Sequence, residues 1–366
     1  MRGVASVVMV MAASMACVGC AGADMETELV SSQSAFMSAA TGGLIVPAYF
    51  SADAQGDASF AEITGGHRSN LPEIAIVNAG CDSTGRKSQQ TGGCAIGGGP
   101  GPTRSSYVHD KIAYLRAQGI KVFGYVWVGS VTAGGTTAYR STDDIVADMR
   151  AWAQNYADDG NPLTLVNGFF FDAAYRKSAG GVPQAEYIAQ KAGEYATWSG
   201  PAVGEIGTAT GGRAIFNWGT TADAYMRGYL DCVLRLGPGN AEGWNYVVVQ
   251  EDAAPDFLTT NGELPSWARY QYNPGHFISI VHHASSDASD TPTLLDAARK
   301  AWNSAYTYIT DLPTPDDNHY YSSAPASAVW AAQAAQGGTA DFVYGASEDV
   351  FATSCPAASN ATPAYP

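Results

Sequence analysis

The stretch "LVNGFFFD", residues 165–172, decides the fold class of this chain. Phe169, Phe170 and Phe171 form an apolar run that has to leave water, and the run ends in a single acid, Asp172. A strand that is apolar at successive positions is buried on both faces, as strands are in parallel sheets covered by helices. The stretch therefore predicts a buried parallel strand with a carboxyl group at its C-terminal end.

Seven further runs of the same kind recur along the chain, with amphipathic segments between them. The eight runs cover residues 43–50, 73–80, 121–128, 165–172, 212–219, 245–252, 276–283 and 305–311. Helical patterns, two of them with capping Ser or Thr residues at the start, occupy residues 105–119, 141–160 and 292–305. This alternation predicts an α/β fold, a (β/α)8 TIM barrel over residues 43–335 that forms a single catalytic domain. An open doubly wound sheet is the alternative, but no GxGxxG motif follows the first run.

The composition limits the classes of partner. The chain has 366 residues, 46% of them apolar and 14% charged, with a net charge of −15. Such a negative field repels nucleic acid and anionic lipid, so we expect neither as a partner, whereas a neutral or cationic ligand is compatible with it. We expect a monomer that needs no cofactor.

The N-terminus has the features of an export signal. Arg2 precedes an apolar stretch that is too short for a comfortable membrane span, and small residues lead into Cys20, as in a bacterial lipobox. This predicts a lipoprotein-type signal peptide over residues 1–19 and lipidation of Cys20, with plain cleavage near "CAGA" as the alternative. The protein would then be exported, to the bacterial cell surface or periplasm as a lipoprotein held by its lipid anchor, or secreted. Residues 20–42 read as a flexible tether and residues 336–366 as a C-terminal extension.

Export makes disulfide bonds possible. Four cysteines remain beyond the signal region: Cys81, Cys94, Cys232 and Cys355. Cys81 and Cys94 bracket a glycine-rich loop that a disulfide bond would hold closed, and we predict that they pair. Cys232 and Cys355 would pair by elimination only. The spacing of Cys and His residues in the exported chain predicts no zinc or other metal site.

The active site of a barrel lies at the C-terminal ends of its strands. The ends of these runs carry acids, amides and aromatic residues, and no lysine or cysteine nucleophile. Aromatic rings stack on sugar rings, while amides and acids bond to sugar hydroxyls, so the rim predicts a carbohydrate site. The residues expected to contact the substrate are Tyr49, Asn78, Tyr125, Trp127, Asn217, Trp218, His282 and Asp311. His282 and His283 are neighbours on a strand, so we expect only one of them to line the mouth.

Cleavage of a glycosidic bond requires two carboxyl groups. Asp172 ends the fourth run and Glu251 ends the sixth, each after apolar residues that would remove water from its surroundings. We predict that these two acids are the catalytic pair. The alternative for each is a structural carboxylate that caps the following helix.

Several segments, in this order, resemble the spherulin-4-like glycoside hydrolases over residues 44–330. The similar segments are "LIVPAYF", "IAIVNAG" with "GPGP", "LRAQGIKVFGYVWV", "STDDIVADMRAWAQNY", "VNGFFFDAA", "YVVVQED" and "YTYITD". The resemblance implies a barrel that acts within chains of α-1,4-linked galactosamine or N-acetylgalactosamine, a polysaccharide that is cationic when partly deacetylated. It also implies that Asp172 and Glu251 occupy the positions of the family's strand-four aspartate and strand-six glutamate.

One position departs from that family's pattern. Where the pattern has Asp-Glu, this chain has Asp172 followed by Ala173. If the missing glutamate only binds substrate, the chain is an endo-glycosidase with Asp172 as nucleophile or stabilising carboxylate and Glu251 as acid/base. If it is indispensable, the chain is a non-catalytic polysaccharide-binding protein on a decayed barrel. A metal-dependent polysaccharide deacetylase that uses His282 or His283 is a third hypothesis.

Overall fold

The structure is a computed structural model. It describes residues 36–41, 43–50, 52–65, 71–80, 98–133, 136–158, 161–174, 181–193, 213–219, 230, 232, 245–259, 264–265, 268–269, 272–312, 323–336, 339–344 and 357–361. The expectations for residues 1–19, for lipidation of Cys20 and for pairing of Cys81 with Cys94 lie outside these residues. Cys232 is disulfide-bonded, and every other cysteine of the chain lies outside the described residues.

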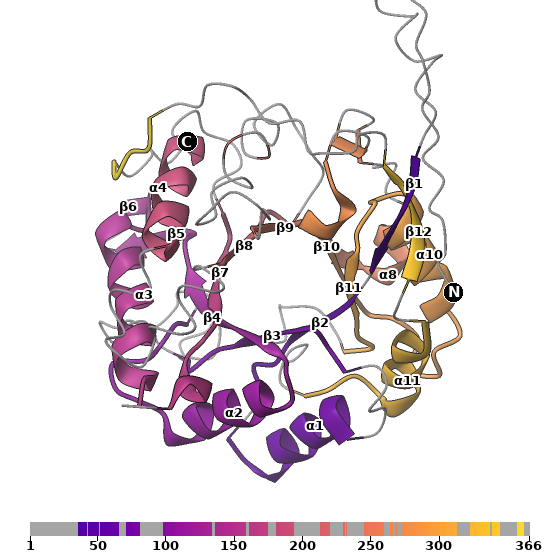
Figure 1. The fold of residues 1–366 in the computed structure, drawn as a ribbon, viewed down its shortest axis with the longest axis horizontal. Coiled ribbons are helices and arrows are strands. Elements are labelled where there is room, and N and C mark those ends of the chain that lie inside the picture. Colours follow the sequence, from indigo (N-terminus) through magenta and orange to yellow (C-terminus); the bar gives the residue numbers. More distant parts are fainter. Residues whose placement is uncertain are drawn as a thin grey trace, which may run out of the picture. The chain divides into compact units, whose positions relative to one another are not determined.

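Eight parallel strands close into a barrel, and they follow one another around it in chain order (Figure 1). The strands are β2 (Gly43–Pro47), β3 (Ile74–Val77), β4 (Lys121–Trp127), β7 (Gly168–Asp172), β8 (Arg213–Asn217), β9 (Tyr246–Ala253), β10 (Phe277–His282) and β11 (Tyr306–Ile309). Each of the eight apolar runs in the sequence coincides with one of these strands, and β9 extends one residue beyond its run. The predicted TIM barrel is therefore confirmed.

Helices lie around the outside of the barrel (Figure 1). They are α1 (Ala54–Gly65), α2 (Ser106–Ala117), α3 (Thr142–Tyr156), α4 (Gly181–Gly193), α8 (Ala254–Thr259), α10 (Thr291–Lys300) and α11 (Ser327–Gln336), with 3-10 turns η1 (Pro162–Thr164) and η3 (Pro274–His276). The predicted serine caps are present, because Ser105 Oγ accepts the Val108 amide at 3.3 Å and Ser141 Oγ accepts that of Asp144 at 3.2 Å. Among the described helices, none is both long and apolar enough to cross a membrane.

Helix α3 packs on strand β4 through one large side chain. Trp152, which is fully buried, donates its indole Nε1–H to the carbonyl of Tyr125 at 2.9 Å. The indole lies where a side chain at Gly124 would be, since a Cβ atom there would meet it at 2.7 Å. The glycine in "KVFGYVW" thus allows the helix to bond to the strand in the middle of the barrel wall.

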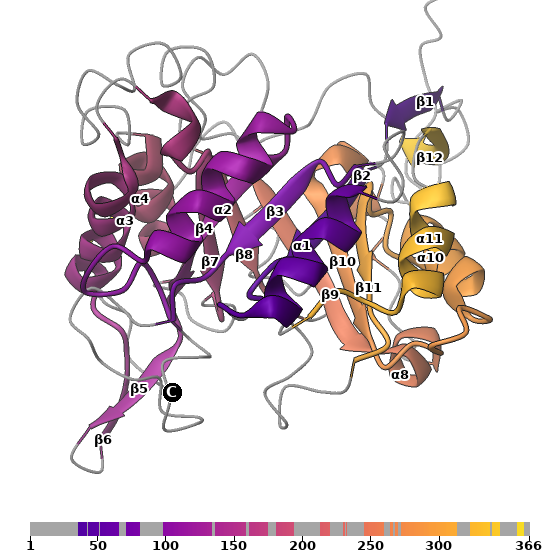
Figure 2. The ribbon, with the colours of Figure 1, turned by 90° about the horizontal axis from the view of Figure 1, so that it is seen from below.

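In the described part of the chain, two antiparallel pairs of strands lie outside the barrel sheet. β1 (Phe36–Thr41) pairs with β12 (Thr339–Tyr344), which joins the end of the predicted tether to the start of the predicted C-terminal extension. β5 (Ser130–Ala133) pairs with β6 (Thr136–Tyr139), and Figure 2 shows this hairpin projecting from the end of β4.

The base of the β5–β6 hairpin is tied to the barrel by a buried ion pair. Arg140, 3% exposed, donates to the Trp127 carbonyl at 2.9 Å and to the Asp148 carboxylate at 2.5 Å. Because a buried charge without a partner is costly, the pair fixes the return of the chain to the mouth of the barrel. The hairpin therefore leaves and rejoins the barrel next to Trp127, the last residue of β4.

Candidate active site

The site is built around Asp172, the last residue of β7. Three hydrogen-bond donors converge on its carboxyl group. The Tyr125 hydroxyl donates to Oδ2 at 2.5 Å, and the Ala173 amide and Asn217 Nδ2 donate to Oδ1 at 2.9 Å and 2.8 Å. These bonds fix the orientation of the carboxyl plane and favour its charged form.

Asn217, at the end of β8, connects Asp172 to the second predicted catalytic acid. The same Nδ2 atom donates to Asp172 Oδ1 at 2.8 Å and to Glu251 Oε2 at 2.6 Å. A carboxylate only accepts hydrogen bonds, so the amide nitrogen has to face both acids. The two oxygens consequently lie no farther apart than the sum of those two distances, and the structure brings the predicted pair together.

The proximity of the two acids alters the protonation of Asp172. Burial and the charge of Glu251 raise the pKa of Asp172 from 3.8 to about 6, against the opposite effect of its three hydrogen bonds. Two carboxylates this close resist ionising together. Below about pH 6 Asp172 consequently keeps a proton that an aspartate with the ordinary pKa of 3.8 has largely lost.

Tyr49 and His282 complete the electrostatic surroundings. Burial, followed by the charges of Asp172 and Glu251, raises the pKa of Tyr49 well above its ordinary value, so the phenol stays neutral. Burial lowers the pKa of His282, although the nearby Glu251 charge opposes this shift. His282 is 6% exposed, whereas His283 is exposed, so only the first of the two neighbouring histidines is enclosed at the mouth.

Of the two predicted tryptophans, Trp127 lies next to Asp172, and Trp218 follows the amide residue that joins the two acids. Trp127 pairs with Asp172 in the parallel register of β4 and β7, and its indole Nε1–H approaches the Ser130 carbonyl at 3.4 Å. A Cβ atom at Gly129 would meet the Trp127 ring at 2.5 Å and the Ala173 methyl at 2.8 Å. Trp218, which follows Asn217, is 4% exposed and is therefore largely covered by protein in this state.

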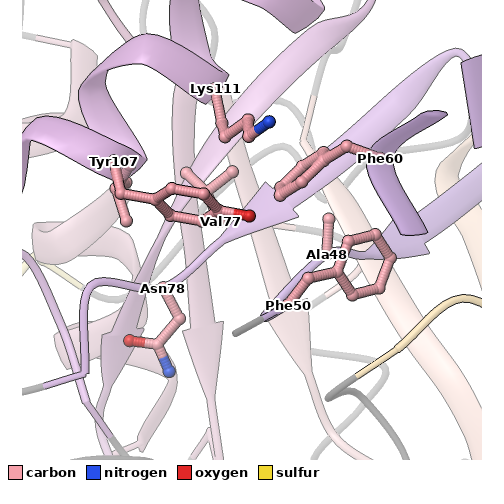
Figure 3. A pocket seen from close by; sticks show the side chains of 8 residues that line it. Ala48, Phe50, Phe60, Val77, Asn78, Tyr107 and Lys111 are labelled. Carbon is pink, nitrogen blue, oxygen red and sulfur yellow. The ribbon is translucent and has the colours of Figure 1, made fainter. Parts of the chain in front are cut away.

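Asn78 lies in a different environment from the acid pair. Its Oδ1 accepts the Gly80 amide at 2.9 Å, which closes a turn after β3. Asn78 also lines a small pocket, whose other lining residues are Ala48, Phe50, Phe60, Val77, Tyr107, Val108 and Lys111 (Figure 3). The Lys111 ammonium lies 5.0 Å from the centroid of the Phe60 ring.

Asp311 has a structural partner in the described chain. Its Oδ1 accepts the amide of Ala326 at 2.7 Å, in the segment that leads into α11. The prediction that it contacts the substrate thus competes with a bond that orders the start of a helix. A structural carboxylate that caps the following helix was the alternative to a catalytic role for a strand-end acid. Asp311 makes a bond of this structural kind.

The sequence did not reveal how Ala173 contributes to the site. Its backbone lies in the left-handed region, with φ of 54°, which an alanine adopts at a cost of about 1–2 kcal/mol. This conformation accompanies the 2.9 Å bond from the Ala173 amide to the Asp172 carboxylate. A glycine would have signalled such a turn, but an alanine gives no signal in the sequence.

The described residues contain no group of three His, Cys, Asp or Glu side chains placed to hold a metal ion. Within that part of the chain, neither His282 nor His283 therefore lies with two further side chains that could complete a metal site. The site that the geometry does assemble is a pair of carboxyl groups held by one amide and enclosed by aromatic residues.

Comparison with known proteins gives a likeness of fold. No protein-family profile and no curated protein matches the sequence. The solved structure of Sph3 from Aspergillus clavatus, in complex with GalNAc, is similar with a TM-score of 0.52 and 17% identity, over 80% of this chain and 97% of that chain. PbGH5A, a glycoside hydrolase family 5 enzyme from Prevotella bryantii B14, covers 82% of this chain and 99% of its own at 13% identity, but its TM-score of 0.34 is too low to bear on the site.

Proposed function

We propose that the protein is an endo-acting glycoside hydrolase that cleaves α-1,4-linked galactosamine or N-acetylgalactosamine polysaccharide with Asp172 and Glu251. The observation that carries the proposal is the single Asn217 amide nitrogen that bonds to both carboxyl groups. The segments similar to spherulin-4-like hydrolases support the substrate class. The shared fold with Sph3, a protein solved with GalNAc, agrees with it.

The spacing of the acids favours a retaining mechanism. Asp172 Oδ1 and Glu251 Oε2 are both within hydrogen-bond distance of one nitrogen, at 2.8 Å and 2.6 Å. The sum of these distances is below the roughly 6.5–9.5 Å that an inverting pair leaves for a water molecule, and it accommodates the roughly 5–5.5 Å of a retaining pair. One acid can thus attack the sugar directly while the other serves the leaving group.

In the proposed reaction the protonated Glu251 donates its proton to the glycosidic oxygen as the bond to the anomeric carbon breaks. Asp172 attacks that carbon and forms a glycosyl ester. Glu251, now ionised, takes a proton from a water molecule as that water attacks the anomeric carbon, which breaks the bond to the Asp172 oxygen, releases the sugar and restores both acids. Atoms and charge balance without any metal or cofactor.

The roles follow from the hydrogen bonds of Asp172. Its pKa of about 6 depends on burial and on the charge of Glu251. The three donors to Asp172 favour its charged form, which suits a nucleophile, and the acid/base role then falls to Glu251, its partner in the pair.

The charge of the protein suits a polymer of amino sugars. The net charge of −15 is compatible with a polymer that carries free amino groups.

A second function rests on Ala173. The glutamate that the resembling family carries at this position is absent, and the alanine methyl lies against Gly129. If hydrolysis requires that glutamate, the same mouth binds the polysaccharide without cleaving it. In either case we propose that the chain is exported, as a lipoprotein anchored through Cys20 or as a secreted protein, because of its N-terminal signal.

Incubation of the purified protein with a panel of galactosamine-containing and other polysaccharides tests the proposal. We expect mass spectrometry to detect short oligosaccharides released from the α-1,4-galactosamine polymers, with new reducing ends inside the chains. Binding to these polymers without any released product on long incubation supports the non-catalytic function instead. Neither binding nor release from any member of the panel rejects both.

A further inference from the structure

Tyr125 stands on β4, and the sequence predicts it as a substrate contact. Stacking on a sugar needs an exposed ring face, but only 2% of this residue is exposed. Its ring packs edge-on against Tyr49, with centroids 5.3 Å apart, and lies 5.9 Å from the ring of Phe170. The ring is thus part of the barrel interior, and its hydroxyl is the group that reaches the site.

The hydroxyl donates to Asp172 Oδ2 at 2.5 Å. This is a short bond, as expected between a phenol and a carboxylate. The other oxygen, Oδ1, accepts from Asn217 and Ala173, so Tyr125 is the only described donor to Oδ2. Removing the hydroxyl would leave that oxygen without its hydrogen bond while the opposite oxygen kept two.

The backbone of Tyr125 is held from outside the barrel. Its carbonyl accepts the indole N–H of Trp152 at 2.9 Å, in a contact that the missing side chain of Gly124 makes possible. Parallel pairing of Tyr125 with Phe170 also fixes its height relative to Asp172, two residues farther along β7. The hydroxyl is therefore fixed in position before any substrate binds.

We propose that Tyr125 is a positioning residue, whose hydroxyl orients the Asp172 carboxylate and stabilises its negative charge. The inference rests on the proposed function only in naming Asp172 as the nucleophile. According to this inference, Tyr125 holds the catalytic carboxylate and does not contact the sugar.

The groups that face Asp172 determine what loss of the hydroxyl does. The titratable ones are Tyr49 beyond β2, Tyr125 on β4 and Glu251 on β9, with His282 on β10 facing Glu251. The bond from Tyr125 lowers the pKa of Asp172, whereas burial and Glu251 raise it. Without the hydroxyl, Asp172 should therefore hold its proton to a higher pH than the present value of about 6.

The first test needs no substrate. In protein labelled with ¹³C at aspartate carboxyl groups, the Asp172 resonance is followed by NMR against pH, and Asp172→Asn assigns it. Tyr125→Phe should move the midpoint of this titration to higher pH by about one pH unit, a typical effect of one hydrogen bond to a charged group. Tyr308→Phe is the matched control, because the buried Tyr308 hydroxyl bonds to Thr310 and is not among the groups that shift the pKa of Asp172. An unchanged midpoint in Tyr125→Phe overturns the inference.

The second test separates positioning from binding. On the polymer that the protein cleaves, Tyr125→Phe should lower kcat by about 100-fold and leave KM nearly unchanged, because the bond acts on a charge that changes in the transition state. A raised KM with unchanged kcat would make Tyr125 a substrate contact and overturn the inference. If the wild-type protein cleaves nothing, the proposed function fails, and the NMR titration still decides the role of Tyr125.

A third measurement covers the case in which Tyr125→Phe does not fold. In the wild-type protein the ¹³Cζ resonance of Tyr125 should shift with the same midpoint as the Asp172 carboxyl group, because the two share a hydrogen bond. A Tyr125 resonance that does not follow the Asp172 titration overturns the inference.

Discussion

The pair of Asp172 and Glu251 contributes to the way in which the stability of the protein depends on pH. The pKa of Asp172 is raised to about 6 in the folded protein, so the folded state keeps a proton that the unfolded chain has already released. The contribution of this group to stability is full at low pH and is lost as the pH rises through about 4 to 6. Above that range Asp172 is ionised, close to Glu251 and within reach of the same amide.

Glu251→Gln should consequently stabilise the protein above about pH 6. We expect its free energy of unfolding at about pH 8 to exceed that of the wild type by roughly 1 kcal/mol, because one pKa unit corresponds to about 1.4 kcal/mol. At about pH 4 the gain should be smaller, since Asp172 is already protonated there. Denaturant titrations at the two pH values measure both differences, and a gain that is equal at both would contradict the coupling.

At the residue scale, the sequence predicts the acids but not what holds them. Asp172 was identifiable because it ends an apolar strand, and Glu251 because it follows an apolar run close to the C-terminal end of β9. The three donors to Asp172 come from three different elements, and their convergence depends on the register between strands. That register is a product of barrel closure, which local patterns do not specify.

At the scale of elements, the packing of α3 on β4 positions the site from the outer face of the barrel. A Cβ atom at Gly124 would lie 2.7 to 2.9 Å from three atoms of the Trp152 indole. The indole is rigid and is bonded to the Tyr125 carbonyl, so it cannot yield without breaking that bond.

Gly124→Ala should therefore lower the free energy of unfolding by about 1–3 kcal/mol, the usual cost of overpacking a core. Gly65→Ala is the matched control, because nothing lies within 4 Å of a Cβ atom at the last residue of α1. Its stability should be unchanged or slightly raised, as alanine is the better helix former. Equal stabilities of the two variants in denaturant titrations would show that the close approach of Trp152 to β4 is not required.

The closure of the barrel illustrates what element patterns leave out. β11 pairs with β2 at Tyr306 and Thr307 only. Beyond them, the side-chain amide of the buried Gln333 on α11 accepts the Ile309 N–H at 3.1 Å and donates to its carbonyl at 2.8 Å. A polar residue in an otherwise apolar helix completes the hydrogen bonds of a strand edge, and periodicity alone gives no reason to expect it.

At the scale of the whole molecule, the eight strands were predictable because buried parallel strands are apolar along their whole length. The β1–β12 ribbon was not, since the segment around β1 is rich in small and polar residues and its partner lies about three hundred residues later. Residues 36–41 come just before β2 and residues 339–344 come just after α11, so their pairing depends on the closed barrel that brings these segments together. Composition indicated a tether there, whereas residues 36–41 form a strand.

The central claim is that a carboxyl pair at the mouth of this barrel hydrolyses a galactosamine polysaccharide. The most direct measurement is the rate at which oligosaccharides are released from α-1,4-linked galactosamine polymer by the wild type, Glu251→Gln and Glu73→Gln. Glu73 is a matched control, because it lies just before β3, at the opposite end of the barrel, where it contacts Tyr306 and Lys121. We predict that the wild type and Glu73→Gln release oligosaccharides at similar rates and that Glu251→Gln is slower by about 100- to 10,000-fold. Undiminished release by Glu251→Gln would contradict the account.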